Sequence, residues 1–473
     1  MTLPGRLHPM AADAVERAID RAAGGRPIPG NRVEVLFDGP IAFDRMLDLI
    51  AKAERWIHFD NYIFHADRTG ARFADALIDR ARDGLAVRVS TDWLGSLSTP
   101  ARFWARFEAA GISVRHFHRP GLFDLSTVLS RNHRKLVVAD GRRAVLGGIC
   151  IGDEWAGDPA RERLPWRDTA LLVEGPAATA LDQAFRRTWG VTGDQLPNDE
   201  SAGDVAAAGT AAVRVLAGEP AQERAYRASE LLLATAASRV WITDAYLVAP
   251  RRLFRYLVDA AREGVDVRLL VPGTSDLPLI RNLTRLGYRE LLRSGVRIFE
   301  WKGPMLHAKT VVADGQWVRV GSSNLNHSSL VDNYELDVLV DDPGLAEQME
   351  AQFRRDLDGS AEVRVRPLRA PAPIRRVLPP ALGFERLKGA GAPHRRGLSE
   401  QGRRSVLAVR TLVAGARLAV FGPLAVVFAV MAVLFFLVPM VMGLIFGVTS
   451  IWLALVSLAE VLRRRRDALE RGS

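Results

Sequence analysis

An internal repeat limits the folds open to this chain of 473 residues more than any other feature of its sequence. Four short segments recur in the same order in the two halves: 56–62 with 240–246, 81–89 with 261–269, 110–114 with 294–298, and 136–140 with 310–314. In the second pair, a helical pattern ends at Gly84 or Gly264 and an alternating apolar run follows. Helices that alternate with strands in this way predict an α/β fold. We therefore expect two lobes related by a pseudo-twofold axis, each a mixed β-sheet flanked by helices, over 31–195 and 210–360.

The residues outside these lobes are expected to form a terminal and a connecting segment. Residues 1–30 predict an N-terminal helical segment, and 196–209, rich in Gly, Asp, Ser and Ala, predict a linker. The single cysteine, Cys150, excludes an internal disulfide and a clustered cysteine metal site. Nothing in the sequence therefore requires an oxidising compartment.

The net charge of +10 by itself would indicate a nucleic-acid partner, but the basic residues are not spread evenly along the chain. Residues 361–417 hold 13 Arg or Lys against three Glu, and residues 418–473 hold five Arg against three acidic residues. These segments carry +10 and +2, so residues 1–360 carry −2. A lobe region with this charge repels a polyanion, and we expect no nucleic-acid partner.

The C-terminal segment predicts a membrane anchor. Leu418–Ala459 comprises 42 residues without a charge, whereas one membrane-spanning helix needs about 20. Pro439 and Gly443 lie near the midpoint, and arginines flank both ends. Basic flanks on both sides predict a transmembrane helical hairpin over 418–462 with both ends in the cytoplasm. The alternative is a buried helical pair of a soluble domain.

The segments beside this hairpin are strongly basic. Residues 361–417, rich in Pro and Arg, are expected to form a juxtamembrane linker, and 463–473 a basic cytoplasmic tail. Such segments either bind the anionic membrane surface or only signal the topology. The sequence thus predicts a protein of the cell inner membrane with its catalytic lobes on the cytoplasmic side.

Each lobe contains a His-x-Lys pair followed by an aspartate five residues after the lysine. These residues are His133, Lys135 and Asp140 in the first lobe, and His307, Lys309 and Asp314 in the second. The chain has only five lysines and otherwise uses arginine, so two lysines at equivalent positions indicate a need for a compact ammonium charge. Residues i and i+2 of a strand share a face, so each histidine is expected to point the same way as its lysine.

Two such pairs brought together would surround a phosphate. One neutral imidazole can attack phosphorus, while the other, protonated, donates to the leaving alkoxide. The two lysines neutralise charge on the non-bridging oxygens. This chemistry needs neither a metal nor an organic cofactor, and the sequence shows no cluster with metal-ligand spacing.

The duplicated motif, with Gly147-Gly148 and Gly321-Ser322 seven residues beyond its aspartates, resembles the phospholipase D superfamily over roughly residues 31–360. Longer segments are most similar to bacterial cardiolipin synthases: Asn132–Lys135, Gly147–Trp155, Trp166–Thr169, Met305–Lys309, Gly321–Leu325 and Asn333–Leu336. The resemblance implies a membrane-associated phosphatidyltransferase. It would make cardiolipin from phosphatidylglycerol, or from another phospholipid donor, through a covalent phosphohistidine.

The resemblance also implies roles for the motif residues. His133 would be the nucleophile and His307 the general acid and later the base, although the two roles can be exchanged. Lys135 and Lys309 match phosphate-binding lysines. The two motif aspartates are expected to tie down the turn behind each motif.

Four further residues follow from the same resemblance. Ser322 and Asn324 match a phosphate-contacting pair. Glu335 matches a carboxylate that orients the second histidine, and Asp168 is expected to orient the first; a solvated strand charge is the alternative for both. Cys150 stands where the family usually has asparagine, and a thiol is a weak donor, so the first lobe is expected to make one phosphate contact fewer.

Three other functions remain open at this point. A phospholipase D that uses water as acceptor would share the covalent intermediate and the same residues. A nuclease is disfavoured by the charge of the lobes, and a non-catalytic membrane scaffold by the intact histidines and lysines of both motifs.

Overall fold

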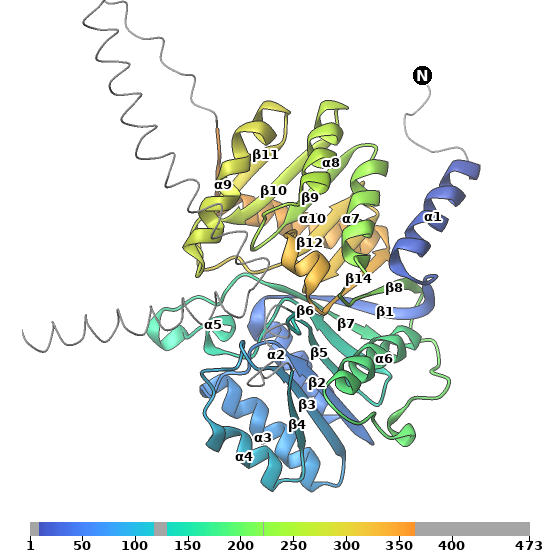
Figure 1. The fold of residues 1–473 in the computed structure, drawn as a ribbon, viewed down its shortest axis with the longest axis vertical. Coiled ribbons are helices and arrows are strands. Elements are labelled where there is room, and N and C mark those ends of the chain that lie inside the picture. The colour runs from blue at the N-terminus through green and yellow to red at the C-terminus, as the bar shows by residue number, and fades with distance from the viewer. Residues whose placement is uncertain (1–8, 118–129, 221, 365–473) are drawn as a thin grey trace, which may run out of the picture. The chain divides into compact units, whose positions relative to one another are not determined.

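The computed structural model describes residues 9–117, 130–220 and 222–364, which form an α/β fold around one 15-stranded sheet (Figure 1). The predicted α/β class is confirmed. The predicted hairpin at 418–462, the tail at 463–473 and nearly all of the basic segment 361–417 lie outside the described residues.

The first half of the sheet consists of β1 (Ile28–Phe37), β2 (Trp56–Asn61), β3 (Ala86–Asp92), β4 (Ser113–Phe117), β5 (Lys135–Ala139), β6 (Arg143–Gly147) and β7 (Thr169–Glu174). The second half consists of β8 (Ala211–Gly218), β9 (Arg239–Thr243), β10 (Asp266–Pro272), β11 (Arg297–Trp301), β12 (Thr310–Ala313), β13 (Trp317–Gly321), β14 (Glu335–Asp341) and β15 (Ser360–Glu362). The helices of the described residues are α1 (Pro9–Ala23), α2 (Asp38–Ala51), α3 (Arg68–Arg82), α4 (Ala101–Ala109), α5 (Asp153–Ala156), α6 (Pro176–Val191), α7 (Arg224–Thr235), α8 (Arg251–Arg262), α9 (Pro278–Arg293) and α10 (Pro343–Asp358).

The order of the strands repeats outward from the centre of the sheet. It is β1-β7-β6-β5-β2-β3-β4 in the first half and β8-β14-β13-β12-β9-β10-β11 in the second, with β15 added at that edge. At the centre β1 and β8 pair antiparallel, with Ile28 opposite Val213 and Asn31 opposite Ala211. The two halves therefore share one sheet, where the sequence predicts a separate sheet in each lobe.

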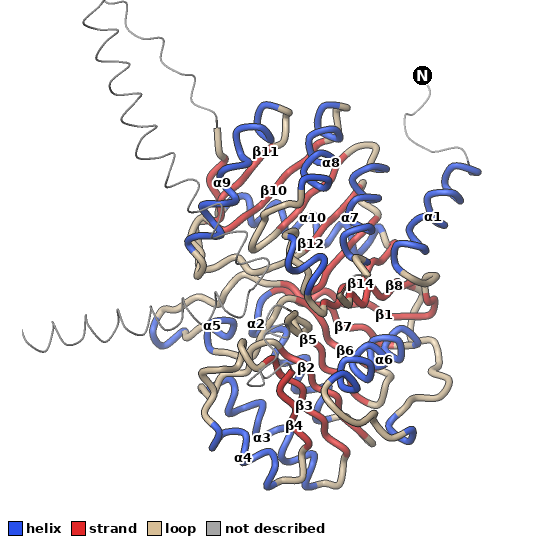
Figure 2. Tube along the Cα trace, in the orientation of Figure 1, coloured by secondary structure: helices blue, strands red, loops and turns tan. Residues whose placement is uncertain are grey.

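Helices cover both faces of the sheet, as the blue and red segments of Figure 2 show. In β5, Val137 and Ala139 pack against the core under α2, α3 and α4, whereas Leu136 and Val138 pack into a core that contains α6 and α10. Alternate residues of a strand point to opposite faces, so a strand buried on both sides reads as a continuous apolar run. The core under α6 and α10 includes strands of both halves and joins them.

The N-terminal helix packs against the second half of the fold. Ile19 and Ala23 of α1 belong to the core that contains α7, α8 and α9. Arg214 of β8 donates to Asp20 at 2.9 Å and is paired with Glu16. Among residues 9–117, 130–220 and 222–364, no helix is long and apolar enough to cross a bilayer.

Each motif aspartate holds the turn before the neighbouring strand. Asp140 has a positive φ of 55° and accepts hydrogen bonds from the backbone N–H groups of Glu54, Arg55 and Trp56 at 2.8–3.0 Å. Asp314, with φ 53°, does the same for the three residues 237–239. Both aspartates lie at the opposite end of a strand from the motif histidine, so their place in the fold is structural.

Replacing Asp140 with alanine is expected to lower the free energy of unfolding by about 3 kcal/mol, because bonds to a charged acceptor contribute about 1.5–3 kcal/mol each and are not additive. Alanine also tolerates a positive φ poorly, whereas asparagine tolerates it and keeps one acceptor. Asp140→Asn should therefore lose less than half as much. Urea unfolding followed by tryptophan fluorescence measures both; equal stability of Asp140→Ala and wild type would contradict this role.

Candidate active site

The two motifs meet where the halves of the fold join. Asn132 forms a bridge with Tyr334, and Arg167 forms the equivalent bridge with Leu306. The backbone N–H of His133 donates to the Tyr334 carbonyl at 2.9 Å, and that of His307 donates to the Arg167 carbonyl at 2.7 Å. Each motif histidine is thus anchored by the backbone of the other half.

The carboxylates of the site are exchanged between the halves. His133 Nδ1 lies 3.1 Å from Glu335 Oε2, and His307 Nδ1 lies 2.8 Å from Asp168 Oδ2. The prediction that Glu335 serves His307 and Asp168 serves His133 is wrong. The reason is the backbone pairing across the halves. It places each histidine beside the start of a strand in the other half, where the carboxylate of that half lies.

Each carboxylate is buried and fixed by donors besides its histidine. Glu335 accepts from the hydroxyl of Ser322 at 2.5 Å and from that of Ser329. Asp168 accepts from Trp155 Nε1 at 2.9 Å and from the backbone N–H of Thr169 at 2.8 Å. Burial by itself would raise the pKa of both carboxyl groups, but the neighbouring histidines and lysines lower it below the ordinary value. Both groups are therefore ionised, and neither is a solvated strand charge.

These contacts fix the tautomer of both histidines. His133 Nδ1 lies between two acceptors, Glu335 and the Ser322 carbonyl at 3.2 Å, so this nitrogen carries the proton in the neutral ring. Burial lowers the pKa of His133, and burial together with Lys309 lowers the pKa of His307 to about 4. Before substrate binds, both rings are neutral, with the Nε2 lone pair available for attack.

The motif lysines are buried beneath two tyrosines. Lys135 and Lys309 donate to the backbone carbonyls of His133 and His307, respectively. Lys135 Nζ lies 5.1 Å from the ring centroid of Tyr62, and Lys309 Nζ lies 5.7 Å from that of Tyr246, which is cation–π distance. Sequence reasoning did not select these tyrosines as site residues, although each closes the first repeated segment of its half.

The Lys309 charge is expected to limit activity at alkaline pH. Burial lowers the pKa of Lys309 to about 8, so its ammonium group deprotonates as the pH rises through 8 and a phosphate loses one partner. We expect kcat/KM, which reports the free enzyme, to fall about tenfold per pH unit above that value. Lys309→Arg keeps its charge over this range, so its kcat/KM should not fall above pH 8, although its activity is lower at every pH. Identical pH profiles from pH 6 to 10 would contradict the assignment.

Ser322, Asn324 and Cys150 complete the surroundings of the site. The Ser322 hydroxyl is engaged with Glu335, so this residue supports the carboxylate. Asn324 is buried, and its Oδ1 has no hydrogen-bond partner among the described residues. Cys150, at the equivalent place in the first half, is also buried, and burial raises the pKa of its thiol, which is therefore neutral.

Two tryptophan rings contact the motif histidine of the second half. The ring of Trp166 lies 5.8 Å from that of His307, and the ring of Trp155 lies 5.3 Å away, edge to face. These two aromatic rings cover one side of His307. Both residues belong to segments that carry the resemblance, which is the one sequence signal that could have selected them.

Two His–Lys pairs from the halves of a duplicated α/β sheet, with their carboxylates exchanged, define an enzyme of the phospholipase D superfamily. A family model described as "Cardiolipin synthase, PLD-like domain" matches residues 231–357. The chain is 32% identical to cardiolipin synthase A of Pseudomonas putida (strain F1) over 353 residues, which are 74% of this chain and 73% of that protein. It is also 32% identical to cardiolipin synthase A of Pseudomonas entomophila (strain L48) over 354 residues, with the same coverage. The chain belongs to the cardiolipin synthase family.

A solved structure shows the same fold. The crystal structure of phosphatidylserine synthase from Haemophilus influenzae Rd KW20 aligns with a TM-score of 0.58 and 15% identity. The alignment covers 74% of this chain and 92% of that one. At this identity the likeness concerns the fold alone.

Proposed function

We propose that this protein is a membrane-associated phosphatidyltransferase that makes cardiolipin from two molecules of phosphatidylglycerol. The observation that carries the proposal is the pair of motif histidines, each with Nδ1 held by a buried carboxylate of the other half. Membership of the cardiolipin synthase family supports the choice of substrate. Other phospholipid donors enter by the same chemistry.

In the first step, Nε2 of His133 attacks the phosphorus of the donor lipid. The bond from phosphorus to the oxygen of the headgroup glycerol breaks. His307 gains a proton as the anionic phosphate binds, and it gives that proton to the leaving alkoxide. Glycerol leaves, and a phosphatidyl group remains on His133. Lys135 and Lys309 neutralise the non-bridging oxygens throughout.

In the second step, the hydroxyl of another phosphatidylglycerol replaces glycerol. His307 removes its proton, the oxygen attacks phosphorus, and the bond between nitrogen and phosphorus breaks. Cardiolipin leaves and His133 is free again. Water in place of the second lipid would give phosphatidic acid, so Trp155 and Trp166 beside His307 favour transfer by limiting the access of water.

We further propose that the predicted hairpin at 418–462 holds the protein on the cell inner membrane, with the two-histidine site on the cytoplasmic side. The basic flanks of the hairpin support this orientation. The basic segment 361–417 would then lie beside anionic lipid. Phospholipid substrates and the anionic membrane surface are thus the partners that we propose.

Product analysis tests the proposed function. Purified full-length protein is incubated with vesicles of labelled phosphatidylglycerol, and the lipids and released glycerol are separated. Equal amounts of cardiolipin and glycerol are expected. Phosphatidic acid as the main product would identify a hydrolase with the same site. Absence of any lipid turnover would overturn the proposal: a protein that then cleaves nucleic acid is a nuclease, and one that does not is a scaffold.

A further inference from the structure

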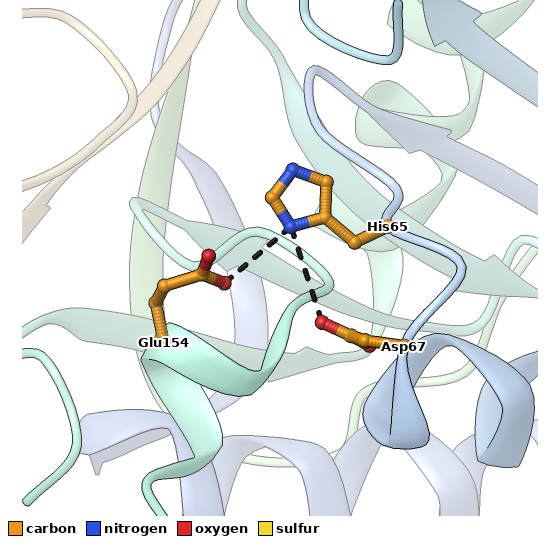
Figure 3. A group of neighbouring side chains, drawn as sticks. All are labelled: His65, Asp67 and Glu154. Atoms are coloured by element: carbon orange, nitrogen blue, oxygen red, sulfur yellow. Dashed lines mark ion pairs between the residues drawn. The ribbon is translucent and has the colours of Figure 1, made fainter. Parts of the chain in front are cut away.

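Three side chains outside the two-histidine site converge like the ligands of a metal ion (Figure 3). They are His65, Asp67 and Glu154, and the donor atoms that they offer all lie within 4.8 Å of one another. His65 Nδ1 is 3.4 Å from Glu154 Oε2 and 3.9 Å from Asp67 Oδ2. The sequence shows no such cluster because Glu154 is far along the chain from the other two residues.

The distances between donor atoms suit one small cation. Metal bonds of about 2.1 Å place neighbouring ligand atoms about 3.0 Å apart in an octahedral site and about 3.4 Å apart in a tetrahedral one. The distance between His65 and Glu154 already has this value, and that between His65 and Asp67 exceeds it by about half an ångström. The Asp67 and Glu154 oxygens lie within 4.8 Å of each other, so binding one cation requires the two carboxylates to rotate toward each other.

The backbone holds these ligands in place without a cation. Asp67 Oδ1 accepts from the backbone N–H of Gly70 at 2.8 Å, and Oδ2 accepts from that of Asp153 at 2.7 Å, which leaves one lone pair of Oδ2 facing His65. The backbone N–H of His65 donates to the Ile151 carbonyl at 2.9 Å. Hydrogen bonds that orient metal ligands in this way raise affinity.

One donor atom of the cluster has only a long contact. Glu154 Oε2 is itself shielded from solvent, and the contact given for it among the described residues is the ion pair with His65 Nδ1 at 3.4 Å. An oxygen held by one long contact keeps a lone pair that a cation can take. The cluster also lines an open pocket of about 750 Å³, through which a hydrated cation can enter.

A glycine keeps the space between the ligands free. A methyl group on Gly152 would lie 2.6 Å from Glu154 Oε2 and 3.1 Å from His65 Nδ1. Gly152 has φ −172°, an extended conformation that alanine also adopts, so the backbone itself does not require glycine here. The methyl group would either fill the cation position or push Glu154 out of it.

We infer that His65, Asp67 and Glu154 bind a first-row divalent cation such as Zn²⁺ or Mn²⁺. One imidazole and two carboxylates form a mixed nitrogen and oxygen donor set, which suits these ions better than the softer thiolate-binding ones. Three protein ligands leave further coordination positions to water from the pocket. The inference concerns binding and does not depend on the proposed lipid substrate.

The short helix α5 connects this site to the two-histidine site. Glu154 is followed by Trp155, whose Nε1 donates to Asp168, the partner of His307. The carbonyl of Glu154 also accepts from the backbone N–H of Trp166 at 2.8 Å. A cation on Glu154 would therefore stiffen the element that positions Asp168 and His307, although it touches neither.

Isothermal titration of the chelator-treated full-length protein with ZnCl₂ and MnCl₂ tests this inference. Wild type is expected to bind one cation at this site, and His65→Ala and Gly152→Ala to bind at least about tenfold more weakly. Gly203→Ala is the matched control, because a methyl group there meets nothing within 4 Å. The cation should also raise the thermal midpoint of wild type and Gly203→Ala, but not that of Gly152→Ala.

The thermal midpoint without added cation shows whether Gly152→Ala still folds. If it does not, the cation affinity of His65→Ala relative to wild type tests the inference. A cation held instead by the catalytic histidines would persist in Gly152→Ala and disappear in His133→Ala, and this result would overturn the inference. So would a wild-type protein that binds neither cation at millimolar concentration.

Discussion

The His133→Ala protein is expected to turn over lipid at least about 10⁴-fold more slowly than wild type, because it loses the nucleophile that carries the phosphatidyl group. His307→Ala should be slowed about 10²–10⁴-fold, since general acid and base catalysis contributes that much. The fold should survive both changes, because among the described residues each ring makes one side-chain hydrogen bond, to a carboxylate that keeps other donors. Release of labelled glycerol from phosphatidylglycerol vesicles measures both rates.

The covalent intermediate separates the two roles. With a donor lipid whose leaving group needs no proton, His307→Ala should still form the phosphatidyl-enzyme and then stall, whereas His133→Ala should form none. Intact-protein mass spectrometry after rapid mixing detects the adduct. An adduct on the His133→Ala protein would show that the roles are exchanged and that His307 is the nucleophile.

Asp168→Asn and Glu335→Gln are each expected to lower kcat about 10²–10⁴-fold with little change in KM. An amide cannot stabilise the imidazolium, and it can present its N–H₂ to Nδ1 and so favour the wrong tautomer. Because the carboxylates are exchanged between the halves, each variant should resemble a particular histidine variant. Asp168→Asn should accumulate the phosphatidyl-enzyme as His307→Ala does, and Glu335→Gln should fail to form it.

The matched control for these variants is Asp140→Asn, whose carboxylate serves the turn before β2. Its kcat should stay within a few-fold of that of wild type at a temperature where it is folded. If His133→Ala formed no adduct, and Asp168→Asn also abolished it while Glu335→Gln let it accumulate, the crossed pairing of carboxylates and histidines would have no functional meaning.

Sequence reasoning could select Asp168 and Glu335 but could not predict which side chains bury them and donate to them. Their positions in the resemblance indicated carboxylates that orient histidines. Nothing local in the chain shows that Trp155 donates to one and Ser329 to the other, because these donors reach the carboxylates by short helical turns whose direction depends on packing. The same holds for Tyr62 and Tyr246 above the lysines.

The duplicated α/β fold and the His–Lys pairs could be predicted from the sequence, because helix and strand periodicity, glycine stops and a repeated motif are local patterns that are visible without knowledge of contacts. Three other features arise only in the folded chain: the single sheet formed when β1 pairs with β8, the exchange of Asp168 and Glu335 between the histidines, and the meeting of Glu154 with His65 and Asp67. Each of these depends on residues that are far apart along the chain. Such residues meet only when distant segments hydrogen-bond to each other, across the two halves for the first two features and within the first half, from His65 to Ile151, for the third. No local pattern specifies that register.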